Sequence, residues 1–316
     1  MIWYTYAAAV NGQNFECKHF TMIGAFVLSM LLATGDHAAM NPLFEELRTK
    51  GFALAGDTRA TLPAPSMPDG LDAAAQQVAL TKIVGDRYTI DEFVRDSVVT
   101  PFVLKFPETR GEAVTPRGVD LWFIVYGDLN DLSKVDVLRD FNGGQKSDAT
   151  LHVLTESELT ARQLPSTSAD SDKHVAAIGE TEERFAHTVA SILDRVELHH
   201  TLRCVLSRTK ESVMIATLVD RRFDGDANFP NIYHRLIRND AGDLTKGAAQ
   251  PYSGAGGYMK ATQLAQPKGA ILVEYHAIYS EPHDWFNGAN LLQSKLPILL
   301  QSRVRELRRD VRASKN

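Results

Sequence analysis

The chain has 316 residues, a formal net charge of −5 and a pI near 6.1. Its length gives room for one large domain or two small ones, each with a real hydrophobic core. Hydrophobic residues make up 44% of the chain and charged residues 23%, values that exclude wholesale disorder. A nucleic-acid-binding protein would carry a basic field, which this acidic chain lacks. We therefore expect a globular protein without a nucleic-acid partner.

An apolar run near the N-terminus, Phe20 to Ala33, is typical of the core of an export signal. It is shorter than the roughly 20 residues that a membrane-spanning helix needs. The small residues at its end predict cleavage after Gly35, with Ala38 or Ala39 as alternatives; an uncleaved anchor or a buried helix is the other interpretation. We expect residues 1–35 to be an export signal and the mature protein to be periplasmic or secreted, with no stable transmembrane anchor.

Residues 41 to 154 combine short helical patterns, a proline-rich linker and a few strand-like runs. The linker, Leu62 to Gly70, contains three prolines, which exclude a helix or a central strand. The run Val119 to Tyr126 is apolar on both faces and predicts a strand that is covered on both sides. The predicted helices are 41–50, 71–84, 89–95 and 129–141, and the predicted strands are 98–106, 119–126 and 150–154.

The last third of the chain predicts a series of strands that leads into one long helix. The expected strands are 195–207, 212–221, 231–238, 258–264 and 270–280. In the last strand, Tyr275 and Tyr279 share an apolar face, whereas Glu274 and His276 lie on the opposite face, where we expect them to meet solvent. The glycine-rich run Ser253 to Gly257 lacks the spacing of a nucleotide-binding loop and predicts a flexible connection.

The closing segment, Ala289 to Arg312, places its leucines and valines three or four residues apart, as in one stripe of an amphipathic helix. The proline at position 297 should kink or restart this helix near its beginning, because its nitrogen donates no hydrogen bond.

This order of elements, ILVEYHAIYSEPHDWF followed by NLLQSKLPILLQSRVRELRRDVR, resembles the START-like, polyketide-cyclase-like (SRPBCC) helix-grip superfamily. The resemblance covers about residues 191–312 and rests on element order, and the long region before residue 190 departs from it. It implies an α+β fold in which a curved antiparallel sheet wraps around a long C-terminal helix and encloses a lipid, sterol, polyketide or other apolar molecule. We expect an N-terminal segment and linker over 36–70 and a single α+β domain over 71–316, with an unrelated α+β fold as the alternative.

If the helix-grip interpretation holds, the ligand-binding residues are Tyr233, Tyr275, Tyr279, Leu296 and Leu300. Plain core packing is the alternative for each of them. The predicted function is non-covalent binding or carriage of a lipid-like or other apolar small molecule. The alternatives are an enzyme on the same scaffold and an envelope interaction protein with no small ligand. Nothing in the sequence predicts an oligomeric state.

Two polar groups are candidates for chemistry. Glu274 and His276 could exchange protons with a substrate because a Glu/His pair on one strand face suits acid–base catalysis. Asp224, Asp226 and Asn228 alternate like the ligands of a calcium loop. A polar hairpin turn explains those three residues equally well. The chain has no zinc, nucleotide or nucleophile-elbow motif, and we expect no cofactor and no metal.

Overall fold

A computed structural model describes residues 36–55, 58–107, 115–132, 150–165, 177–239, 242–286 and 291–313. The predicted export signal and most of the predicted helix 129–141 lie outside these residues. No helix in the described part of the chain is long and apolar enough to cross a bilayer.

Short helices and long strands alternate along the chain. The helices are α2 (His37–Met40), α3 (Pro42–Thr49), α4 (Ala73–Val84), α5 (Ile90–Phe93), α6 (Leu129–Leu132), α8 (Glu156–Thr160) and α9 (Leu291–Ala313). The strands are β1 (Phe52–Ala55), β2 (Thr58–Ala60), β3 (Phe102–Lys105), β4 (Thr115–Tyr126), β5 (Thr150–Val153), β6 (Thr181–Ile192), β7 (Val196–Arg208), β8 (Ser212–Val219), β9 (Ile232–Arg238), β10 (Leu244–Pro251), β11 (Ala255–Gln263) and β12 (Ala270–Glu281).

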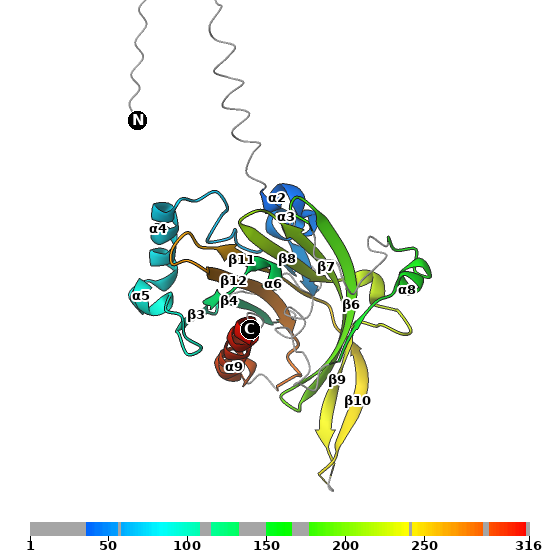
Figure 1. The fold of residues 1–316 in the computed structure, drawn as a ribbon. Coiled ribbons are helices and arrows are strands. Elements are labelled where there is room, and N and C mark those ends of the chain that lie inside the picture. Colours follow the sequence, from blue (N-terminus) through cyan, green and yellow to red (C-terminus); the bar gives the residue numbers. More distant parts are fainter. Residues whose placement is uncertain are drawn as a thin grey trace, which may run out of the picture. The chain divides into compact units, whose positions relative to one another are not determined.

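Most of the strands join one antiparallel sheet. Its order is β10-β9-β7-β8-β11-β12-β4-β3, and β6 pairs with β7 and with β5. A separate small hairpin joins β1 to β2. The sheet is curved, with α9 on one side and α3 and α4 on the other (Figure 1). The chain is therefore α+β, with a curved antiparallel sheet and a long C-terminal helix, as predicted.

The sheet has two buried faces, which we call the helix face (toward α9) and the arm face (toward residues 36–70, the N-terminal arm). Strand β4 shows the alternation that separates them. Leu121, Phe123 and Val125 pack in the cluster on the helix face, and Trp122 and Ile124 pack in a cluster on the arm face. The prediction that this strand is covered on both sides is confirmed.

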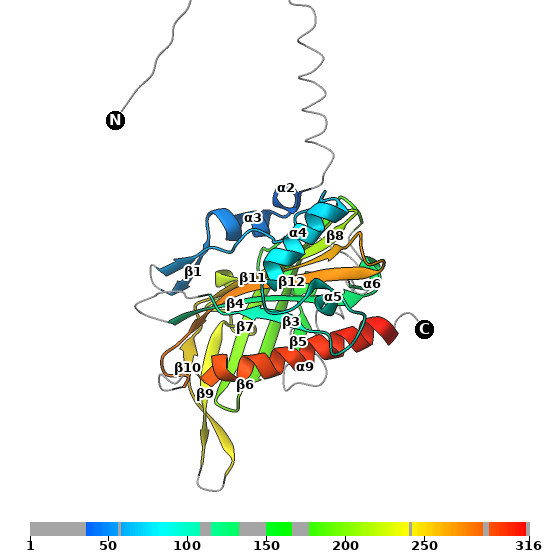
Figure 2. The ribbon, with the colours of Figure 1, turned by 90° about the vertical axis from the view of Figure 1, so that its left-hand side faces the viewer.

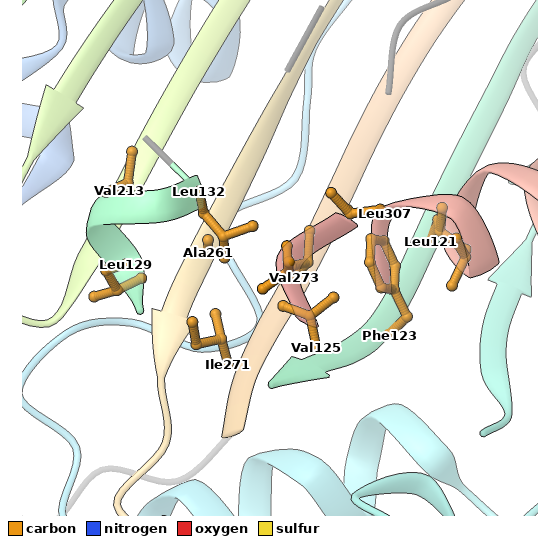
Figure 3. Packing of buried hydrophobic residues seen from close by; sticks show 12 residues of the cluster. Leu121, Phe123, Val125, Leu129, Leu132, Val213, Ala261, Ile271, Val273 and Leu307 are labelled. Carbon is orange, nitrogen blue, oxygen red and sulfur yellow. The ribbon is translucent and has the colours of Figure 1, made fainter. Parts of the chain in front are cut away.

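The helix face is an apolar core closed by α9 (Figure 3). Val304, Leu307 and Val311 supply the helix side of this core at the predicted spacing. The helix runs from Leu291 to Ala313 without a restart at Pro297. Figure 2 shows α9 lying alongside β3, the strand at one end of the sheet order.

The arm face is covered by the segments that precede β3. Helix α3 places Phe44 against Tyr258 of β11, with ring centroids 5.0 Å apart. Helix α4 places Leu80 and Ile83 in the cluster that contains Trp122. The predicted N-terminal segment thus packs on the same sheet as the rest of the described chain.

In the large sheet, the sequence missed two strands, β6 and β10. The first, TEERFAHTVASI, has no clear apolar alternation, and the second, LTKGAAQP, lacks large apolar residues and is almost wholly exposed. The predicted flexible connection at Ser253 to Gly257 is wrong, because Gly256 and Gly257 belong to β11. A Cβ at Gly256 would come within 2.9 Å of the Phe52 ring, and one at Gly257 within 2.7 Å of the His276 carbonyl oxygen. The glycines therefore permit close packing.

Candidate functional site

Strand β12 places the predicted catalytic pair together on the arm face. The Nε2 atom of His276 lies 3.5 Å from Oε2 of Glu274, and its Nδ1 atom lies 2.7 Å from Oδ1 of Asp120. The expectation that the pair meets solvent is wrong, because Glu274 is 0% exposed and His276 is 2% exposed. The sequence alternation identified the shared face correctly, but it could not show that the N-terminal arm covers that face.

Glu274 fixes the proline-rich part of the arm to the sheet. The backbone N–H of Ser66 donates to its Oε2 at 2.7 Å, and that of Met67 donates to its Oε1 at 3.4 Å. The indole Nε1 of Trp122 donates to the hydroxyl of Ser66 at 3.1 Å. Both carboxylate oxygens are thus occupied by the chain's own donors, which suits an anchor better than a general base.

The charge of His276 is set by its carboxylate neighbours. Burial alone would lower the pKa of His276, but hydrogen bonds to Asp120 and Glu274 outweigh burial and raise that pKa above its usual value. The two carboxylates therefore favour the protonated form of the ring. A buried cation with two counter-charges stabilises the folded arm and needs no ligand.

A second polar group lies beside this pair on the arm face. Lys260 Nζ lies 2.7 Å from Oδ1 of Asp69, and Asp69 also accepts from the hydroxyl of Ser212 at 2.7 Å. His37 lies 2.7 Å from the hydroxyls of both Ser207 and Ser212. Burial, then Lys260, lowers the pKa of His37 to about 4, so its ring is neutral at pH 7. We call Glu274, His276, Asp120, Lys260, Asp69, His37, Ser207 and Ser212 the arm network.

The arm network contains serine, histidine and aspartate side chains, but its burial excludes them as an open nucleophilic site. Ser207 and Ser212 are 0% exposed. Asp69 is held by Lys260 and by the hydroxyls of Thr209 and Ser212, and its Oδ2 lies 3.9 Å from Nε2 of His37, too far for the hydrogen bond by which a catalytic aspartate orients a histidine. The side chains of the arm network hold the N-terminal arm against the sheet.

The opposite face holds a groove of about 500 Å³ between α9 and residues 87–106. The groove runs along β3, a strand that pairs only with β4 among the described strands. Eight of the thirteen described lining residues are apolar or aromatic, and the charged ones are all arginines. The lining residues are Arg87, Tyr88, Val99, Thr100, Pro101, Phe102, Leu104, Phe106, Pro297, Gln301, Val304, Arg305 and Arg308.

Arg308 is the buried charge of this groove and is only 4% exposed. Its guanidinium donates to backbone carbonyls, at 2.9 Å to Ile124, 2.6 Å to Thr100, 3.1 Å to Val98 and 3.2 Å to Pro101. Burial, reinforced by nearby arginines of α9, lowers the pKa of Arg308 to about 10. It therefore stays charged at pH 7 and holds residues 98–101 against the sheet. The sequence shows several arginines near the end of α9, but no local pattern indicates which of them is buried.

The predicted ligand-binding residues lie elsewhere on the helix face. Tyr275 and Leu300 pack against the cluster closed by α9. Tyr233 and Tyr279 belong to a second aromatic cluster, in which the hydroxyl of Tyr233 donates to Asp284 at 3.0 Å. Leu296 is half-buried on α9. These residues are not part of the groove lining, and their role in ligand binding stays a prediction.

The calcium-loop candidates are engaged by other side chains. Asp226 pairs with Arg162 at 2.5 Å and also accepts from the backbone N–H of Asn228 at 2.9 Å. The hydrogen bond from Arg162 is the main reason that the pKa of Asp226 lies well below its usual range. Asp224 accepts from the side-chain amide of Asn231 at 2.8 Å. The geometry favours the turn interpretation, and the described residues contain no cluster of three or more metal-ligating side chains suited to an ion.

Comparisons with known proteins add a likeness in fold only. No family model and no curated protein sequence matches this chain. Among solved structures, the chain is similar to human STARD10, with 8% sequence identity and a TM-score of 0.33. The match covers 79% of this chain and 82% of that one. At so low a TM-score the likeness carries no functional argument, and any function must be inferred from the residues of this chain.

Proposed function

We propose that the protein binds a lipid-like or other apolar small molecule, without covalent chemistry, in the groove between α9 and residues 87–106. The observation that carries this proposal is the groove itself. Its volume of about 500 Å³ falls within the roughly 300–1,000 Å³ typical of small-molecule sites. Ligand sites of that kind combine apolar and aromatic side chains with polar groups that orient the ligand. Here eight of the thirteen lining residues are apolar or aromatic, and five are polar or charged.

The walls of the groove come from segments that are far apart in the sequence. Phe102 and Leu104 of β3 form one wall, and Pro297 and Val304 of α9 form the other. Phe102 and Leu104 also pack against the core of the helix face, which holds this wall in place. An alkyl or ring system in the groove would extend that core, and burial of apolar area would drive its binding at about 25 cal/mol per Å².

The enzyme and interaction-protein alternatives have less support. The Glu274 and His276 pair is covered by the arm and occupied by backbone donors. Exposed apolar side chains near the groove, such as Val99 and Ile298, are 63% exposed each and are compatible with an apolar ligand or a partner. The concave shape of the groove favours a small ligand over a protein partner as the molecule that it binds.

Native mass spectrometry of the purified protein, followed by solvent extraction, tests the proposal. We expect a lipid-like adduct in stoichiometric amount. Gln301 lines the groove from the exposed side of α9, and Gln301→Trp should fill the groove and abolish the adduct. Ser302→Trp is the matched control, since Ser302 is exposed on the same helix and lies outside the lining. Equal adduct in both variants would place the ligand elsewhere, and no uptake of any apolar probe would refute binding.

We also propose that the protein is exported. The support is the apolar run from Phe20 to Ala33 and the small residues that follow it. Cleavage after Gly35 would retain His37, whose ring contacts two serines of the sheet, whereas cleavage after Ala38 or Ala39 would remove it. Sequencing the N-terminus of the protein purified from culture medium or periplasm tests both points. An uncleaved chain in the cytoplasm would refute export.

A further inference from the structure

The charged side chains that line the groove, among the described residues, are all positive. Among the described residues, Arg87, Arg305 and Arg308 contribute to its lining, and no aspartate or glutamate does. A groove lined by one sign of charge, beside low-dielectric walls, concentrates ions of the opposite sign. The apolar floor and the cationic groups together form the complement of an anionic amphiphile.

Two other buried or half-buried cations of the described chain are each paired with a carboxylate, and the groove lacks such a counter-charge among the described residues. Lys260 lies 2.7 Å from Asp69, and Arg162 lies 2.5 Å from Asp226. Arg308 is as buried as Lys260, yet its described partners are four backbone carbonyls and no carboxylate. Carbonyl dipoles satisfy its N–H groups but leave its net charge without a counter-charge.

The two remaining arginines retain donors for a ligand. Arg305 has no ion pair with a described carboxylate, and its helical neighbours at the contacting spacings are Gln301, Ser302, Arg308 and Arg309. The acidic residue next to it, Glu306, already pairs with Arg303 at 3.1 Å. Arg87 is exposed at the groove and likewise has no ion pair with a described residue. A free guanidinium binds a carboxylate or phosphate through two parallel hydrogen bonds.

We infer that the ligand of this groove is a single-chain amphiphile with an anionic head, a long-chain carboxylate or its monophosphate counterpart. The head lies at Arg305 and Arg87, near the buried charge of Arg308. The chain lies along Phe102, Leu104 and Val304. This inference rests on the proposed function, because it assigns a chemical class to the ligand of the same groove.

Dodecanoate and dodecan-1-ol test the inference, because they share a chain and differ in the charge of the head. With the full-length protein at pH 7, titration calorimetry should give a dodecanoate affinity about tenfold or more above that of the alcohol, equivalent to the gain of a charge-assisted hydrogen bond. Because the head interactions lie near the surface, the preference should shrink when sodium chloride is raised. Dodecyl phosphate should bind at least as well as dodecanoate.

Arg305→Gln should lower dodecanoate affinity about tenfold while leaving dodecan-1-ol unchanged. Arg87→Gln should act in the same direction, and it provides a second variant at an exposed position. Arg309→Gln is the matched control, because Arg309 is exposed on α9 and lies outside the groove lining. Its dodecanoate affinity should equal that of the parent protein.

The outcomes separate this inference from the function on which it rests. Equal affinity for dodecanoate and dodecan-1-ol would overturn the anionic head and leave binding of an apolar molecule in place. An equal loss in Arg309→Gln and Arg305→Gln would overturn the assigned site, since a general charge effect would explain both. Failure of both probes to bind would overturn the inference and the proposed function together.

Discussion

The arm face and the α9 groove both contain buried cations, but they balance them differently. On the arm face, His276 lies between Asp120 and Glu274, and Lys260 lies beside Asp69. In the groove, Arg308 has backbone carbonyls as its partners, and two further arginines line the same space. Buried charges are expected to be paired. The first site is therefore complete within the chain, whereas the second has room and charge for a ligand.

The comparison separates the residues that look catalytic from the residues that are accessible. Glu274, His276 and the nearby serines have the side chains of an acid–base site, but the arm encloses them. The groove residues are mostly apolar, with arginines that have no role in proton transfer at neutral pH. Accessibility together with unbalanced charge is thus the better guide to function in this chain.

The largest expected effect tests whether the arm network is a structural anchor. Lys260→Met removes a cation that is 2% exposed and leaves Asp69 buried without its main partner. Breaking a buried pair in this way costs about 3–5 kcal/mol. Urea denaturation should show that loss in the free energy of unfolding.

Two controls make this measurement specific. The double variant Lys260→Met, Asp69→Asn removes both charges and should recover part of the loss. Arg48→Ala breaks the exposed pair between Arg48 and Glu45, which should change stability by less than about 1 kcal/mol. A Lys260→Met protein as stable as its parent would show that the arm is not anchored through this pair.

The second expected effect is a pH dependence on the arm face with two opposite signs. The pKa of His37 is lowered to about 4 in the folded protein. As pH falls, His37 takes up a proton in the unfolded chain before it does so in the folded protein. The free energy of unfolding therefore decreases as pH drops from 6.5 toward 4. One such histidine contributes a slope of about 1.4 kcal/mol per pH unit. For His276 the folded pKa is raised, so its contribution is fully present below 6.5 and is lost as pH rises through the folded value.

Variants of the two histidines distinguish these slopes. His37→Gln should make the acid side of the stability profile less steep, and His187 and His200, whose pKa values are also lowered to about 4, should supply the slope that remains. His276→Gln should make the side above pH 6.5 less steep. The relevant measurement is the change of unfolding free energy with pH, because both variants also lower stability at every pH. The groove offers a contrast, since its arginines keep their charge across this whole range. A parent protein with constant stability between pH 6.5 and 4.5 would contradict the His37 assignment.

The sequence predicted the sheet and the C-terminal helix because both depend on local periodicity. The alternation in residues 270–280 correctly put Glu274 and His276 on one face, and the leucine spacing of α9 correctly gave its buried stripe. Burial of that pair depends on residues 36–70, which lie some 200 positions away. The groove depends on Arg308 meeting carbonyls near residue 100, a contact that no local pattern encodes. Local periodicity thus predicted the elements but could not identify the open site.

A third effect concerns the clamp that Arg308 places on one wall of the groove. Arg308→Lys keeps the charge but cannot span the carbonyls of Ile124 and Thr100 with a planar fork. We expect a loss of about 2 kcal/mol in unfolding free energy, comparable with one hydrogen bond to a charged group. Hydrogen exchange should also become faster in residues 98–105, which checks that the loss is local. Unchanged exchange there would show that the clamp does not hold this wall.

The smallest expected effect tests how closely strands β11 and β12 lie against each other. Gly257→Ala would bring a Cβ within 2.7 Å of the carbonyl oxygen of His276, which belongs to the neighbouring strand β12 and cannot rotate away. Overpacking of this kind should cost about 1–2 kcal/mol. Gly225→Ala is the matched control, because a Cβ at Gly225 meets no atom within 4 Å. Urea denaturation of the two variants should differ by that amount. An equal stability would mean that β11 and β12 can separate slightly at low cost, and that the glycine at position 257 is not needed for their close approach.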